Sequence, residues 1–170
     1  NTELNTTYLN SLDSTSKSMI GNTKYYLGGY NNSDIQKDVM YQYERKIKNT
    51  TGNEFYNGSN PNSWVGKLAL MYASDYGYAA SDECTQTLYN YDNATCKNNN
   101  WLYNIKVNEW LLPQFASYSD AAFNVHSDGF ANRYYVYNNQ LAVRPVLYLI
   151  SSAQITGGYG TSSSPYTLGL

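Results

Sequence analysis

The C-terminal third of the chain constrains the fold most, because short apolar runs alternate there with clear turn signals. These runs have the length and the alternation of half-buried strands. Strands are expected at residues 109–112, 122–126, 131–137 and 142–150. Ser127-Asp128-Gly129 separates the second run from the third, and its glycine accepts the positive φ of a tight hairpin turn. The sequence therefore predicts a small antiparallel sheet with a hairpin at residues 127–129.

Two prolines set limits on these strands. Pro113 is expected to end the first strand, and Pro145 predicts an edge or a bulge in the last one, because proline cannot donate a hydrogen bond to a ladder. Alternate apolar residues of the last strand are expected on one face, namely Val143, Pro145, Leu147 and Leu149. Tyr148 is expected in the core.

The first half of the chain predicts helices and one buried strand. Residues 7–20 carry apolar side chains near a 3.6-residue period, and Gly21 follows as a stop signal. Ser33 is a plausible N-cap for a second helix at residues 34–45. Further elements are expected as a surface loop at residues 49–63, a buried central strand at 64–72 and a tight turn at 74–78. The fold class predicted is α+β, with helices N-terminal and antiparallel strands C-terminal.

The length and composition limit the number of domains and the classes of binding partner to be expected. A chain of 170 residues is most simply one domain, so residues 1–170 are expected to share one core. Charged residues are 14% of the chain and the net charge is −2, so there is no basic stripe for a nucleic acid. No apolar stretch is long enough to predict membrane insertion of this segment. The 20 tyrosines supply rings for a core and hydroxyls for a surface.

Cys84 and Cys96 are the only cysteines, and they flank a polar loop. A disulfide between them would stabilise the fold by about 3 kcal/mol in the chain-entropy model and would indicate an oxidising, extracellular setting. The alternative is two free thiols. No cofactor is expected, and with only one histidine the chain offers no zinc-ligand pattern.

Several short motifs, taken in order, resemble a family of extracellular bacterial domains with a C-type-lectin-like fold. They lie at residues 64–78, 100–102, 110–113, 143–149 and 155–168, together with Gly129 and the Cys84/Cys96 loop. The related group includes the sulfatase-modifying-factor-like domains and the C-terminal domains of collagen-like proteins, and many members lie on prepilin-type or other cell-surface proteins. The resemblance implies a small twisted sheet, two helices and long loops.

Two departures limit what this resemblance implies. Sulfatase-modifying enzymes of this fold use paired cysteines near the C-terminus, whereas no cysteine follows Cys96. Calcium-dependent lectins use Glu-Pro-Asn, Gln-Pro-Asp and Trp-Asn-Asp motifs, and none of these occurs in the chain. Neither the enzyme chemistry nor calcium-dependent sugar binding is therefore carried over.

Residues 117–139 are rich in Tyr, Asn, Ser and Asp, the residues of binding surfaces. Variable proteins of diversity-generating retroelements share the lectin-like fold and a similar composition. Phe123, Val125 and Val136 are expected in the core, and the alternate side chains are expected to face outward. The predicted ligand-binding residues are Tyr118, Asp120, Asn124, His126, Tyr135, Tyr137 and Asn138. The alternatives are that these tyrosines fill the core, or that they form an ordinary Tyr/Asn-rich surface of a secreted protein.

Other chemistry-bearing residues favour structural roles. His126 has no evident nucleophile partner, so no enzyme activity is predicted. Asp75, Asp82 and Glu83 match no calcium-loop spacing, and a solvated loop is the favoured interpretation. Arg144 lies in an apolar run, where pairing with a carboxylate or with backbone carbonyls is expected.

These observations lead to one main functional expectation and one alternative. The main expectation is an extracellular recognition or adhesion module of a bacterial surface or pilus protein, which binds a protein or glycan ligand on another cell or surface. The alternative is a structural pilin-like subunit that contacts other pilus subunits, with the helix at residues 7–20 continuing a removed N-terminal segment.

Overall fold

The computed structural model describes residues 2–45, 63–103, 107–138 and 141–170. Helices and small sheets are both present, so the chain is α+β as predicted. Its internal contacts divide the chain into two compact units. The first comprises Asn1–Lys24, Val65–Ala69 and Pro145–Leu170, and the second comprises Tyr25–Trp64 and Leu70–Arg144. The expectation of a single domain stays a prediction.

The second unit is built on a three-stranded antiparallel sheet, ordered β4 (Glu109–Gln114), β5 (Ala121–Val125) and β6 (Ala131–Tyr135). The hairpin predicted between β5 and β6 is confirmed. Gly129 has a φ of 106°, and its backbone N–H donates to the carbonyl of His126 over 2.8 Å. Phe123 and Val125 are buried, as predicted. Local turn chemistry therefore predicted the β5–β6 hairpin correctly.

Pro113 does not end the first strand, because β4 continues to Gln114. The pairing of β4 with β5 shifts register between Trp110 and Gln114, so the proline lies at an irregular point of the ladder. A bulge of this kind leaves a residue unpaired, and the missing N–H of proline then costs nothing.

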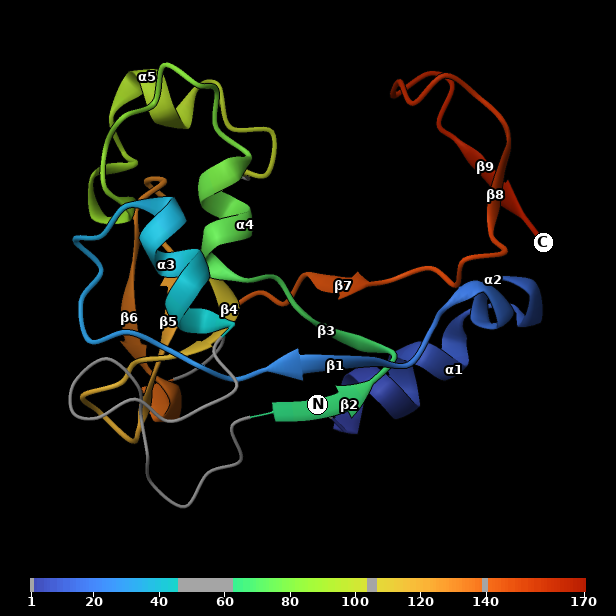
Figure 1. The fold of residues 1–170 in the computed structure, drawn as a ribbon, viewed down its shortest axis with the longest axis horizontal. Helices are drawn as coiled ribbons and strands as arrows, with labels where there is room; N and C mark the ends of the chain where they lie inside the picture. Colours follow the sequence, from blue (N-terminus) through green and yellow to red (C-terminus); the bar gives the residue numbers. More distant parts are fainter. Residues whose placement is uncertain (1, 46–62, 104–106, 139–140) are drawn as a thin grey trace. The chain divides into compact units, whose positions relative to one another are not determined.

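Helices α3 (Lys37–Glu44) and α4 (Ala73–Tyr78) pack against each other in the second unit (Figure 1). Helix α4 replaces the tight turn predicted at residues 74–78. A Cβ atom on Gly77 would lie 2.6 Å from the Cβ of Lys37, so the glycine permits a close approach of two helices and does not mark a turn.

The N-cap predicted at Ser33 is also wrong. Helix α3 begins at Lys37, and the Ser33 hydroxyl instead donates to the side-chain oxygen of Asn132 over 2.9 Å. The loop expected at residues 49–63 lies outside the described residues, apart from Ser63, the first residue of β2 (Ser63–Gly66).

The Cys84–Cys96 disulfide is present, as predicted. Helix η3 (Leu88–Asn90) lies between the two cysteines, and α5 (Ala94–Lys97) contains Cys96. Leu88 and Tyr91, between the cysteines, are fully buried. The loop expected to be polar therefore also contributes to the core of the second unit.

The helix predicted at residues 7–20 is divided into η1 (Leu4–Tyr8), α1 (Leu9–Ser11) and α2 (Ser14–Met19). The division occurs because Asp13 is a better N-cap than an interior residue. Its carboxylate accepts a hydrogen bond from the Ser16 backbone N–H over 2.9 Å, which starts α2 anew.

The buried strand predicted at residues 64–72 is likewise divided, into β2 and β3 (Leu68–Leu70). The Asn5 side-chain oxygen accepts hydrogen bonds from the backbone N–H groups of Lys67 and Leu68, each over 3.0 Å. Strand β2 pairs with β1 (Thr23–Tyr26), and β3 pairs with β7 (Pro145–Leu147).

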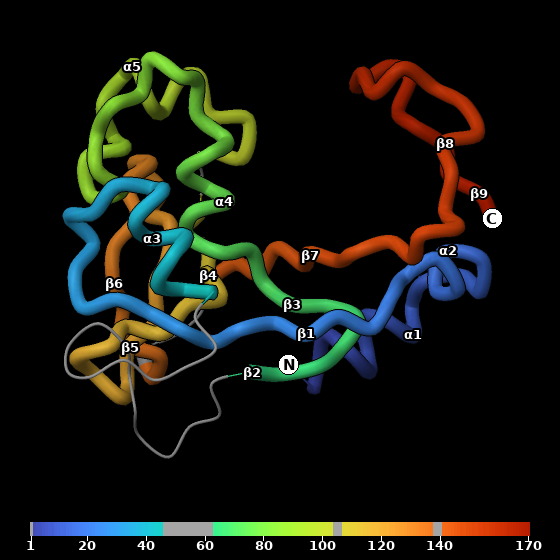
Figure 2. The backbone as a smooth tube through the Cα atoms, in the orientation of Figure 1, coloured from blue at the N-terminus to red at the C-terminus, as the bar shows by residue number. Residues whose placement is uncertain are grey.

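The strand predicted at residues 142–150 is reduced to β7. Val143, Leu147 and Leu149 are 40–50% exposed, and Tyr148 is 48% exposed. The placement of Tyr148 in the core was therefore wrong, because a three-residue strand in a two-stranded sheet cannot bury all of its side chains. The chain then ends in a hairpin of β8 (Gln154–Gly157) and β9 (Thr167–Gly169), which Figure 2 traces out and back. Among the described residues, no helix combines the length and the apolar character needed to span a membrane.

Candidate binding site

The guanidinium group of Arg133, the middle residue of β6, lies among aromatic rings. Its central carbon is 4.5 Å from the ring centroid of Tyr118, 5.5 Å from that of Tyr135 and 5.6 Å from that of Phe115. The rings of Tyr135 and Tyr137 stack at 5.4 Å with 22° between their planes. We refer to Tyr118, Arg133, Tyr135 and Tyr137 as the Tyr–Arg cluster.

Strand alternation places Arg133 and Tyr135 on one face of the sheet. They pair across to Phe123 and Ala121 of β5, both buried, so the aliphatic stem and the ring base rest on the core. After β6 the chain turns through η4 (Val136–Asn138), which brings Tyr137 back onto Tyr135.

The turn between β4 and β5 supplies the remaining tyrosine. The Tyr118 carbonyl accepts a hydrogen bond from the Ala121 backbone N–H over 3.3 Å, and the Tyr118 N–H donates to the Phe115 carbonyl over 3.1 Å. These bonds hold the turn, and the Tyr118 ring meets that of Tyr135 edge-on at 6.4 Å. Two segments that are apart in sequence therefore converge on Arg133.

The cluster is charged and partly open to solvent. Tyr118 is 42% exposed and Tyr137 is 67% exposed, whereas Arg133 and Tyr135 are half-buried. The hydrogen bond that Arg133 donates to the Tyr135 hydroxyl, over 3.3 Å, raises the pKa of the guanidinium further above its ordinary value. The cation is therefore permanent, and three rings limit its movement.

The structure brings together four of the seven residues predicted to bind ligand. Tyr118, Tyr135 and Tyr137 belong to the cluster, and Asp120 is exposed beside it, with its carbonyl accepting from the Val136 backbone N–H over 2.9 Å. Their role in binding stays a prediction. The side chain of Asn138 lies outside the described part of the structure.

Asn124 does not belong to an exposed face, because it is only 2% exposed. It lies on the central strand β5, in register with Trp110 of β4 and Asn132 of β6. Side chains of the two neighbouring strands therefore flank Asn124, whereas the prediction assumed that its side chain faced solvent.

His126 lies at the opposite end of β5 from the cluster. Its ring stacks on Phe130 at 4.6 Å, and its Nδ1 accepts a hydrogen bond from the Asp128 backbone N–H over 3.3 Å. These contacts belong to the hairpin and connect His126 to nothing in the Tyr–Arg cluster.

Val136 is 53% exposed, so its placement in the core was wrong. Strand β6 ends at Tyr135, and the alternation that predicted a buried Val136 ends with it. Arg133 was missed as a site residue. The signal that identifies it is its position two residues before Tyr135, which places both on one face of a strand.

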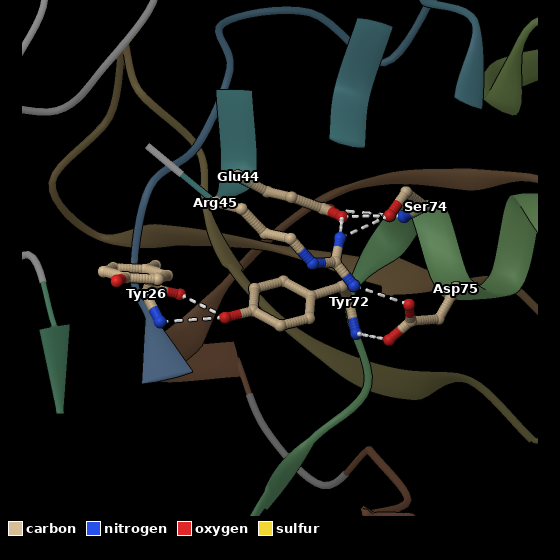
Figure 3. Close-up of polar contacts among 6 residues, drawn as sticks. All are labelled: Tyr26, Glu44, Arg45, Tyr72, Ser74 and Asp75. Atoms are coloured by element: carbon tan, nitrogen blue, oxygen red, sulfur yellow. Dashed lines mark hydrogen bonds and ion pairs between the residues drawn. The ribbon is translucent and has the colours of Figure 1, made fainter. Parts of the chain in front are cut away.

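A second polar cluster joins α3 to the start of α4 (Figure 3). Glu44 is fully buried, and its carboxyl group contacts the Arg45 guanidinium and the Ser74 hydroxyl. Arg45 also donates to Ser74 Oγ and to Asp75 Oδ1, each over 2.7 Å. Burial raises the pKa of Glu44 to about 8, although Ser74 and Arg45 oppose that shift.

The surroundings of this second cluster indicate a structural role. Ser74 is fully buried, and its hydroxyl is already shared between Glu44 and Arg45, so no substrate has access to it. Asp75 Oδ2 accepts from the Tyr72 backbone N–H over 3.0 Å, and the Tyr72 hydroxyl bonds both the N–H and the carbonyl of Tyr26 (Figure 3). The cluster therefore ties two helices to β1.

The charges in this region form no metal site. Asp75 is held by Arg45 and Tyr72, and no group of His, Cys, Asp and Glu side chains within the described ranges could hold an ion. Arg144 pairs as predicted, with the Leu102 carbonyl and with Glu109 Oε1, each over 2.8 Å.

The first unit contains a cavity of about 260 Å³. Its lining is almost entirely aliphatic and aromatic, and includes Leu12, Met19, Leu68, Leu147 and Leu149. Ser16 supplies a hydroxyl but the lining carries no charged side chain. Tyr8 supplies the other hydroxyl of the lining, so the cavity offers few polar groups to orient a ligand.

No protein-family model, curated protein or solved structure matches the chain. The Tyr–Arg cluster therefore has to be interpreted from its own geometry.

Proposed function

We propose that this protein is an extracellular recognition module that binds its ligand through the Tyr–Arg cluster. The observation that carries the proposal is that two tyrosines, Tyr118 and Tyr135, lie against one half-buried arginine at the surface of the sheet, while a third tyrosine stacks on Tyr135. Tyrosine and arginine are the residues most often found at binding hot spots, together with tryptophan. A protein or glycan on another cell or surface is the class of ligand that we propose.

The rigidity of the cluster supports binding as its role. Tyrosine has few rotatable bonds, and the rings here already pack on one another and on Arg133. Little side-chain entropy is then lost when a ligand arrives. An arrangement that served only to stabilise the fold would be expected to bury Tyr137, which is instead 67% exposed.

We further infer a C-type-lectin-like fold for the module and a place on the bacterial cell surface or pilus. The α+β composition, the small antiparallel sheet and the Cys84–Cys96 bond support this inference. A disulfide persists in oxidising compartments outside the cytosol. Binding, not catalysis, is the proposed activity, since His126 is engaged in its own hairpin.

The test is an array of glycans and surface proteins probed with the purified chain. We expect binding to be lost in the double variant Tyr135→Ser/Tyr137→Ser, with only a small fall in melting temperature, because Tyr135 is half-buried and Tyr137 is largely exposed. Tyr159→Ser is the matched control, because Tyr159 is 85% exposed and belongs to the other unit. Undiminished binding by the double variant, or loss of binding together with a large fall in melting temperature, would refute the assignment.

A further inference from the structure

The unused hydrogen-bonding capacity of Arg133 carries an inference about the ligand. A guanidinium group has five N–H donors. In the part of the chain that the structure describes, the Arg133 side chain makes one hydrogen bond, through Nη1 to the Tyr135 hydroxyl. Asp120 lies near enough to favour the charged form, yet the two residues form no ion pair there. Most of the donors therefore remain free to bind a ligand.

The surrounding rings hold the N–H donors of Arg133 in an arrangement that suits an oxyanion. The guanidinium is packed among Tyr118, Tyr135 and Phe115, so its plane is restrained before any ligand binds. A restrained, planar fork of donors matches the two oxygens of a carboxylate or a sulfate.

The neighbouring tyrosines add an apolar face and hydroxyl groups. Tyr137 is largely exposed and nearly parallel to Tyr135, so the pair offers ring surface beside the cation. The C–H face of a sugar ring packs well on such a surface, and tyrosine hydroxyls can bond the hydroxyls of the sugar. One cation beside one ring surface matches a single acidic sugar residue.

Other anionic ligands fit the cluster less well. A nucleic acid is bound through many basic groups, whereas the cluster holds one cation on a chain of net charge −2. An acidic peptide presents several carboxylates in a row, for which one arginine is also a poor match.

We propose that the Tyr–Arg cluster binds an acidic sugar residue, whose anionic group pairs with Arg133 while its ring packs on Tyr135 and Tyr137. This proposal rests on the proposed function, since it names the ligand class of the same site. The anionic group common to such sugars presents at least two oxygens to the guanidinium, as the carboxylate of a uronic or sialic acid does and as a sulfate ester does.

The experiment measures binding to defined probes. They are sialyllactose, a glucuronic acid oligosaccharide and a sulfated oligosaccharide, each beside its uncharged counterpart, and a peptide rich in Asp and Glu. We expect at least one acidic sugar to bind more tightly than its uncharged counterpart, and the preferred group distinguishes carboxylate from sulfate. Arg133→Gln should then weaken that binding about tenfold or more, the effect of losing a charge-assisted hydrogen bond.

Arg133→Lys provides a second variant, because it keeps the charge and most of the stem but loses the planar fork. It should recover only part of the affinity. Melting temperatures of both variants establish that they are folded.

The outcomes separate this inference from the function on which it rests. Equal binding of charged and uncharged sugars, preference for the acidic peptide, or no binding to any probe would overturn the acidic-sugar inference. Binding that survives Arg133→Gln but is lost in Tyr135→Ser/Tyr137→Ser would do the same while leaving the recognition function intact. Binding that survives both variants would refute the proposed site as well.

Discussion

The buried carboxyl group of Glu44 should make the stability of this protein depend on pH. Its pKa is raised from 4.5 to about 8 in the folded chain, chiefly because burial disfavours the charged form. A raised pKa means that the folded state binds the proton more tightly than the unfolded state does. The resulting stabilisation is complete below pH 4.5 and is lost as the pH rises through about 8.

The size of the effect follows from the shift. Each unit of pKa difference is worth about 1.4 kcal/mol, so the free energy of unfolding should fall by at most about 4 kcal/mol between pH 5 and pH 9. Urea unfolding at a series of pH values measures that fall. Glu44→Gln removes the titrating group, so its free energy of unfolding should change much less over the same range.

The decisive quantity is the slope of the free energy of unfolding against pH. The amide introduced by Glu44→Gln cannot reproduce every hydrogen bond of the carboxyl group, so the variant is also less stable at every pH. Glu3→Gln serves as the control, since Glu3 is exposed and its replacement should leave the slope as it is. A wild-type stability that is flat over this range, or a Glu44→Gln variant with the wild-type slope, would refute the reasoning.

Two further predictions concern stability. Replacing Cys84 and Cys96 together by serine should lower the free energy of unfolding by about 3 kcal/mol, because the unfolded chain is no longer cross-linked between residues 12 positions apart. Urea unfolding of the wild-type protein and of the double variant, both without reductant, checks this, and equal midpoints would contradict it. Gly29→Ala should lower the free energy of unfolding by about 2 kcal/mol or more, because the added Cβ would lie 1.8 Å from the Gln114 carbonyl oxygen. Gly21→Ala should lower it much less, because the nearest atom to its Cβ would be 3.4 Å away, and equal melting temperatures for the two variants would contradict this.

The features that the sequence predicted correctly depend on local chemistry. The hairpin at Gly129 follows from its tolerance of positive φ, and the Cys84–Cys96 bond follows from two cysteines around a short loop. The pairing of Arg144 with Glu109 follows from the cost of leaving a half-buried charge alone. In each case a rule about one or two residues was sufficient.

The features that were missed depend on tertiary neighbours. Gly77 has the local signature of a turn, and only the approach of Lys37 explains why the glycine lies in a helix. Asn124 has the alternation of an exposed position, and only the central place of β5 in its sheet explains its burial. Alternation gives the two faces of a strand but does not say what covers each of them.

The sequence predicted only part of the candidate site, because the rest depends on tertiary contacts. The richness in tyrosine around residues 117–139 located it, and three of the tyrosines do converge. The approach of Tyr118 to Arg133 depends on the turn at Tyr118, and the stacking of Tyr137 on Tyr135 depends on the end of β6; alternation predicts neither.

The most direct test of the binding site is a titration of the protein, labelled with carbon-13 on its tyrosine rings, with the tightest ligand from the array, followed by NMR. We expect the ring signals of Tyr118, Tyr135 and Tyr137 to shift with one common dissociation constant, while those of Tyr78 and Tyr159, which are also exposed, stay in place. Shifts confined to tyrosines outside the Tyr–Arg cluster would contradict the account.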